Sequence, residues 1–167
     1  MPKKTYYDSI SEGYEELHKD EQEAKLRLIK ANISVKASDK LLDVGCGTGI
    51  TSQFSEYGCF VVGADPSIKL LQKAEKNGLK NRVCAEAENL PFKDSSFDVV
   101  ISITAIQNFH DIEKGLKEIR RVGKDRFVLS FLKRSPKKDI ITKNIKKLFK
   151  VVKEIEEEKD IIFIAKR

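Results

Sequence analysis

The chain has 167 residues, a net charge of +6, and 40% hydrophobic and 35% charged residues. This length suffices for one domain with its own core, and the composition excludes collagen-like, low-complexity and disulfide-rich chains. The sequence has no apolar run of about 18 residues and no apolar stretch behind its basic N-terminus, so we expect no membrane segment and no signal peptide. Its three cysteines lack metal-ligand spacing, which predicts no metal site and favours a cytoplasmic location.

The first forty residues have a helical pattern. One or two amphipathic turns are expected over Ser11–Leu17, followed by a helix over Glu21–Asn32. The apolar face of that helix is predicted to consist of Ala24, Leu28 and Ala31, with Lys25 off it. We expect a single domain, with residues 1–36 as a helical cap and residues 37–167 as the core.

Short apolar runs alternate with amphipathic segments from residue 40 onward. The predicted strands are Lys40–Val44, Phe60–Ala64, Arg82–Ala85, Phe97–Ile103, Arg126–Leu132, Val151–Glu157 and Asp160–Ala165. The predicted helices are Ile50–Tyr57, Ser67–Asn77, Asp111–Val122 and Lys137–Phe149. This alternation indicates βαβ units, whereas the last two strands leave no room for a helix and must pair as a hairpin. The prediction is therefore an α/β fold with a seven-stranded, mostly parallel sheet, helices on both faces and a C-terminal antiparallel hairpin.

A glycine-rich loop follows the first predicted strand and reads Asp43-Val44-Gly45-Cys46-Gly47-Thr48-Gly49. Such a loop lets the backbone approach a ligand closely and presents amide groups to an anionic group. Its G-x-G-x-G spacing differs from the dinucleotide fingerprint G-x-G-x-x-G, and it lacks the Gly-Lys-Ser/Thr of a Walker A loop. The second strand ends in Asp65-Pro66-Ser67, where a carboxylate can accept both hydroxyls of a ribose or cap the following helix.

Three motifs in order resemble the class I S-adenosylmethionine-dependent methyltransferases, in particular the small group related to the ubiquinone C-methyltransferases. They are Leu41–Gly49, Val61–Ser67 and the stretch from Ala85 to Val100 that contains Leu90-Pro91-Phe92. The resemblance covers nearly the whole chain. It implies a Rossmann-like fold, methyltransferase activity and S-adenosyl-L-methionine as cofactor, but it says little about the acceptor.

The resemblance also implies roles for individual residues. The glycine loop would receive the methionine end of the cofactor, with Asp43 near its amino group, while Asp65 would hold the ribose. Glu86 would accept from the adenine amino group, with Glu88 as an open alternative. The expected cofactor-binding residues are Tyr14, Asp43, Gly45, Cys46, Gly47, Gly49, Asp65, Pro66, Ser67, Glu86, Ala87 and Ser102.

Methyl transfer from a sulfonium is a direct displacement, so the protein mainly aligns the reactants and few catalytic residues are expected. The sequence identifies none, and the polar candidates are Gln107, Asn108, His110 and Tyr14. The first three are equally ordinary loop or helix-cap residues. The segment Tyr7–Glu15 resembles the N-terminal cap motif of the family, in which Tyr14, and next Tyr7, would contact the cofactor; the alternative is a helix that packs its tyrosines on the sheet.

Basic residues are concentrated between Lys133 and Lys150, with eight Lys or Arg and one acid. Two predicted helices carry basic stripes, made up of Lys117, Arg120, Arg121 and Lys124 on one and Lys143, Lys146, Lys147 and Lys150 on the other. These stripes are either a solvated face or an RNA-binding surface beside the carboxyl ends of the strands. The leading hypothesis is a methyltransferase acting on a macromolecule, RNA ahead of protein, with a small activator or partner subunit. A small-molecule (quinone or metabolite) methyltransferase and a non-catalytic cofactor-binding subunit are the alternatives.

Overall fold

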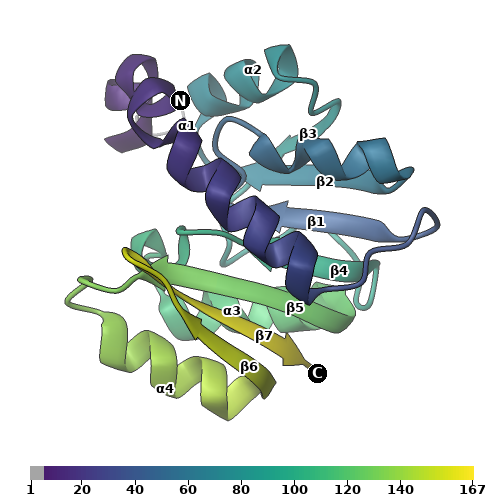
Figure 1. Ribbon diagram of the computed structural model, residues 1–167, viewed down its shortest axis with the longest axis vertical. Helices are drawn as coiled ribbons and strands as arrows, with labels where there is room; N and C mark the ends of the chain where they lie inside the picture. Colours follow the sequence, from purple (N-terminus) through teal and green to yellow (C-terminus); the bar gives the residue numbers. More distant parts are fainter. Residues whose placement is uncertain (1–5) are drawn as a thin grey trace.

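One seven-stranded sheet organises the molecule (Figure 1). The computed structural model describes residues 6–167, with side chains from Lys19 onward. The strands lie in the order β3-β2-β1-β4-β5-β7-β6. Their bounds are β1 Lys40–Val44, β2 Phe60–Asp65, β3 Asn81–Cys84, β4 Phe97–Ser102, β5 Gly123–Leu132, β6 Lys150–Glu156 and β7 Asp160–Lys166.

Strand direction follows the length of the connections. The strands β1 to β5 pair in parallel, and β7 runs antiparallel to both β5 and β6. The turn between β6 and β7 is too short for a crossover helix, so the two strands form a hairpin. The predicted α/β fold, with its mostly parallel sheet and C-terminal hairpin, is confirmed.

Helices cover both faces of the sheet. They are α1 Tyr6–Asn32, α2 Ile68–Lys76, α3 Ile112–Val122 and α4 Lys138–Leu148, with 3₁₀ segments η1 Ile50–Tyr57 and η2 Ile106–Asn108. In Figure 1, α1 crosses the near face over the middle strands, while α3 lies behind the sheet. Side-chain caps begin two of them, because Ser67 accepts from the Leu70 amide and Asp111 from the Lys114 amide. No helix in the part of the chain that the structure describes is long and apolar enough to cross a membrane.

The N-terminal region differs from the prediction. A single helix, α1, replaces the two separate segments, and its buried face is Lys25, Leu26 and Ile29. Ala24 and Ala31, predicted on the apolar face, are exposed. The larger side chains of Leu26 and Ile29 remove more apolar area from water than alanines do, so they set the rotation of the helix. The division into a cap of residues 1–36 and a core of residues 37–167 stays a prediction.

The segment η1 has the bounds predicted for a helix and is a 3₁₀ helix. Its backbone hydrogen bonds join residues three positions apart. The Ser52 amide donates to the Gly49 carbonyl, and the Gly58 amide donates to the Ser55 carbonyl. Gly49 and Gly58, at its two ends, are both left-handed, and Gly49 makes no side-chain cap bond. A short helix without a side-chain cap readily adopts the tighter 3₁₀ form.

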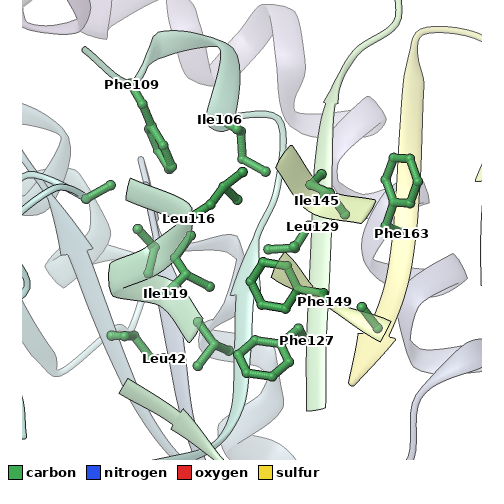
Figure 2. Packing of buried hydrophobic residues seen from close by; sticks show 14 of the residues in the cluster. Leu42, Ile106, Phe109, Leu116, Ile119, Phe127, Leu129, Ile145, Phe149 and Phe163 are labelled. Atoms are coloured by element: carbon green, nitrogen blue, oxygen red, sulfur yellow. The ribbon is translucent and has the colours of Figure 1, made fainter. Parts of the chain in front are cut away.

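The core consists of two apolar clusters, one on each face of the sheet. On the face of α3 and α4, Leu116, Ile119 and Ile145 pack onto β5 (Figure 2). There the rings of Phe127 and Phe149 meet edge to face, with centroids 4.9 Å apart. On the other face, α1, α2 and η1 pack onto the same strands. Because both faces are covered, ligands have access to the central strands only at their ends.

Candidate functional site

The glycine loop lies at the carboxyl end of β1, between β2 and β4. The amides of Gly45 and Cys46 both donate to the Ala64 carbonyl, at 2.8 and 3.1 Å, which ties the loop to β2. Gly45, Gly47 and Gly49 all have positive φ angles, of 75°, 53° and 81°. Gly45 also has no space for a side chain, since a Cβ there would lie 2.5 Å from the Cβ of Ala105.

A cavity of about 270 Å³ opens between the glycine loop and α1. Its floor includes Asp43, the three glycines and Ile103. Its other walls come from α1, through Lys19, Gln22 and Glu23, and from η1, through Ile50, Ser52 and Gln53. The helix α1 therefore forms one wall of the cavity beside the glycine loop.

Asp43 is a buried carboxylate that faces this cavity. Its Oδ2 accepts from the Thr51 hydroxyl at 2.5 Å, whereas its Oδ1 has no hydrogen-bond partner among the described residues. Burial raises the pKa of Asp43 to about 7, opposed by the Thr51 hydrogen bond and assisted by the charge of Asp65. An unpartnered carboxylate oxygen in a cavity is suited to a cationic group, and the ammonium of an amino acid is one.

Asp65, at the end of β2, is 6% exposed and holds the loop from the other side. Its Oδ2 accepts from the Gly47 amide at 2.9 Å and its Oδ1 from the Ser67 amide at 2.8 Å. The side chain of Ser67, rather than that of Asp65, caps α2, and Pro66 lies between them.

The two acids of the predicted adenine side have different surroundings. Oε1 of Glu88 accepts from the Asp111 amide at 3.0 Å, beside the start of α3. Glu86 is 50% exposed, with its Oε2 3.6 Å from Nε2 of His110. Ala87, between them in sequence, is buried.

The acceptor-side candidate Gln107 and the predicted cofactor contact Ser102 are both engaged in hydrogen bonds within the protein. Gln107 donates to the Thr104 carbonyl at 2.8 Å and accepts from the Leu132 amide at 3.4 Å, so both ends of its amide are used. Ser102 is fully buried and donates to the Val44 carbonyl at 2.9 Å. Asn108 and His110 are exposed. The side chains of Tyr14 and Tyr7 lie outside the described residues.

Two features of the site were not predicted from the sequence. Thr51, which donates to Asp43, lies eight residues after it in the sequence. A hydroxyl at that spacing from an acid is too common to indicate a contact. Lys19, Gln22 and Glu23 of α1, which line the cavity, were not among the predicted site residues. Neither feature follows from periodicity, because each depends on how the loop and α1 are packed together.

Comparison with known proteins places the site in a family context. A family model described as a methyltransferase domain matches residues 42–130. An uncharacterized protein of Methanocaldococcus jannaschii is 34% identical over 77% of this chain and 50% of its own length. The demethylmenaquinone methyltransferase of Corynebacterium urealyticum is 34% identical over 57% of this chain and 41% of its own. This chain thus spans about half the length of these relatives.

The fold is shared with solved structures at low sequence identity. A chain of the complex between the Haloferax volcanii Trm112 methyltransferase activator and a methyltransferase superposes with a TM-score of 0.81. The match has 16% identity and covers 96% of this chain and 97% of that one. At this identity, the likeness concerns the fold.

Proposed function

We propose that this chain, which belongs to the methyltransferase domain family, binds S-adenosylmethionine and transfers its methyl group to an acceptor. The observation that carries this proposal is the buried carboxylate of Asp43, which lines the cavity beside α1 and keeps one oxygen without a partner among the described residues. S-Adenosylmethionine supplies an electrophilic methyl group on a sulfonium, which a nucleophile displaces directly. The residues present fit the ammonium of its amino-acid end, through the carboxylate of Asp43. The expected contact of the glycine amides with an anionic group is not supported, because the amides of Gly45, Gly47 and Gly49 already donate within the protein.

The remaining contacts would bind and orient. Asp65, already bonded to the Gly47 amide, would accept from ribose hydroxyls, and its position would fix the loop and the sugar together. Glu86 is the better candidate for the adenine amino group, because Glu88 is occupied by the Asp111 amide. Gln107 would shape the acceptor side rather than touch the reacting atoms, since both ends of its amide are engaged. Alignment of the nucleophile is then the main contribution of the protein.

Calorimetric titration tests the proposal directly. We expect the purified chain to bind S-adenosylmethionine with micromolar or tighter affinity and not to bind NAD, because its loop has the G-x-G-x-G spacing. S-Adenosylhomocysteine serves as a positive control that keeps the amino-acid end and the ribose but lacks the methyl group. Binding of NAD without binding of S-adenosylmethionine would reject the proposal.

For the acceptor, we propose RNA. The supporting observation is that the basic stripes of α3 and α4 meet, since Lys117 and Lys147 both approach Glu113, at 2.9 and 3.2 Å. Lys143 and Lys146 are exposed beside them, although Lys146 also contacts Glu154. We expected the basic stripes beside the carboxyl ends of the strands. Lys150 instead pairs in register with Lys166, and Lys166 pairs with Arg126 toward the amino end of β5. An RNA would then contact the flank of the domain as well as its cavity.

Neutralising Lys143, Lys146 and Lys147 together should reduce the salt dependence of RNA binding. If each lysine meets one phosphate, the slope of log affinity against log salt falls by about 2–3 units through lost counterion release. A filter-binding salt titration measures the slope. Neutralising Lys69, Lys76 and Lys80, exposed on and after α2 on the other face, is the matched control and should leave it unchanged. Equal slopes for both triple variants would favour a small-molecule acceptor.

The fold likeness to the chain solved with an activator also supports a small partner subunit for this chain. Co-purification of the tagged protein from its native source, with and without S-adenosylmethionine, tests this. A stoichiometric partner that increases methyl transfer would support the proposal. If the chain is inactive on its own and its complex with the partner transfers no methyl group either, a non-catalytic cofactor-binding subunit would be favoured.

A further inference from the structure

A buried ion pair joins α1 to the C-terminal hairpin. Lys25 is 3% exposed and Asp160, the first residue of β7, is fully buried. The ammonium nitrogen of Lys25 lies 3.0 Å from Oδ1 of Asp160 and donates to the Thr104 hydroxyl at 2.9 Å. These residues are far apart in sequence, so only the fold brings them together.

The pair is the centre of a network of hydroxyl groups. The Thr104 hydroxyl donates to Oδ2 of Asp160 at 2.6 Å, and Ser130 donates to the same oxygen at 3.1 Å. The Ser130 hydroxyl in turn accepts from the Thr104 amide at 2.8 Å. Thr104 has a left-handed φ of 53°, which is rare for a β-branched residue and requires support from its surroundings.

The network connects two walls of the cavity. Thr104 lies between Ile103, which lines the cavity, and Ala105, which contacts Gly45 of the glycine loop. Lys25 lies directly after the part of α1 that forms the opposite wall, where Glu23 lines the cavity. The loop after β4 and the helix over the site are therefore held to the same carboxylate.

Apolar packing alone does not fix such a helix. Leu26 and Ile29 anchor α1 to the sheet, but apolar contacts are non-directional and permit small rotations and shifts. A buried ion pair is weak evidence for stability, because desolvation offsets its attraction, yet its geometry is directional and can specify one register. A charge pair at this place is thus better explained by positioning than by stability.

We propose that Lys25 is a positioning residue for the cofactor site. Through Asp160 and Thr104, it holds α1 and the loop after β4 in the arrangement that binds S-adenosylmethionine. This inference rests on the proposed function, because the ligand is the one proposed above. The residue acts through its neighbours and does not line the cavity itself.

The test replaces both charges at once. Lys25→Met alone would leave the carboxylate of Asp160 buried and unpaired, whereas Lys25→Met with Asp160→Asn removes both charges and keeps an acceptor for Thr104 and Ser130. The matched control is Arg126→Met with Asp39→Asn. The Arg126–Asp39 pair is partly buried, with its charged atoms 2.7 Å apart, and ties β5 to the loop before β1, away from the cavity.

Two measurements are made on each double variant. Calorimetry gives the affinity for S-adenosylmethionine, and hydrogen exchange on the free protein gives the protection of amides in α1 from Lys19 to Asn32. For the Lys25 and Asp160 variant we expect affinity to fall about tenfold, as when one molecule in ten is competent to bind, with faster exchange in α1. The Arg126 and Asp39 control should lose thermal stability but keep its affinity within twofold.

The outcomes separate the two proposals. An affinity within twofold of the parent, or an equal loss in the control, would overturn the positioning role of Lys25. If the parent itself does not bind S-adenosylmethionine, the proposed function fails, while hydrogen exchange still tests whether Lys25 fixes α1. Exchange in α1 that is unchanged from the parent would reject the positioning role in that case too.

Discussion

Asp43→Asn is expected to weaken S-adenosylmethionine binding by about 30- to 150-fold, corresponding to a loss of about 2–3 kcal/mol. The reason is that Asp43 lines the cavity and its buried Oδ1 has no partner among the described residues, so a charge-assisted bond to the ligand ammonium is the contact removed. Asparagine is nearly isosteric and still accepts from Thr51. Calorimetry of the two proteins at pH 7.5 measures the difference, and equal affinities would exclude Asp43 from the site.

The same substitution, which weakens cofactor binding, should increase the stability of the free protein. Burial raises the pKa of Asp43 from 3.8 to about 7, so between these values the native state holds a proton that the unfolded chain has released. The free energy of unfolding therefore falls as the pH rises from about 4 to about 7. The Asp43→Asn protein lacks this decrease, and above pH 7 its free energy of unfolding should exceed that of the parent by up to about 4 kcal/mol. Urea unfolding at pH 5 and pH 8 measures both proteins.

Asp98→Asn provides a control of opposite sign. The Lys124 hydrogen bond, with a further bond from the Lys40 amide, lowers the pKa of Asp98 below its ordinary value. Its stabilisation is present above the unfolded pKa and is lost as the pH falls, so Asp98→Asn should destabilise the protein at neutral pH. Cofactor affinity should not change, because Asp98 lies at the other end of β4 from the glycine loop. A stability gain in both variants would show that the effect at Asp43 is not local.

Gly45→Ala is expected to cost about 2–5 kcal/mol of stability and at least tenfold in cofactor affinity. A left-handed φ of 75° is strained for alanine by about 1–2 kcal/mol, and the new Cβ would lie 2.5 Å from that of Ala105. Overpacking of this kind adds about 1–3 kcal/mol and displaces the loop. Thermal or urea unfolding gives the first quantity and calorimetry the second.

Two further variants separate strain from contact at Gly45. Gly78 is also left-handed, with φ 94°, but an added Cβ would meet nothing within 4 Å, so Gly78→Ala should show the backbone penalty alone. Ala105→Gly in the Gly45→Ala background removes the methyl group that the new Cβ would meet and should restore part of the stability. If Gly45→Ala costs no more than Gly78→Ala, the close approach to Ala105 is not important.

The sequence by itself determined the architecture and the position of the glycine loop after β1. Continuous apolar runs such as Val99–Ile101 are typical of strands buried on both faces, and helices of crossover length between them favour a parallel sheet. The short link before Asp160 left a hairpin as the sole solution. Three glycines directly after β1 located the ligand loop, because left-handed angles and close approach depend on the residue type at those positions.

Local structure was less certain where strong signals were missing. The segment Ile50–Tyr57 has helical periodicity, yet it forms a 3₁₀ helix because left-handed glycines limit it at both ends and no side chain caps it. In α1, alternative apolar stripes were compatible with the sequence, and the sheet selected the one with Leu26 and Ile29. Periodicity gives the type of element, whereas its rotation depends on the surface against which it packs.

Only the tertiary structure decided how the polar groups of the site are used. The sequence left Glu88 open as an alternative to Glu86, and the Asp111 amide, brought close by the fold, donates to Glu88. Lys25, predicted off the apolar face, is buried because Asp160 lies beneath it, 135 positions further along the chain. Hydrogen bonds and ion pairs act over a few ångströms between atoms whose proximity the fold creates, so no local pattern encodes them.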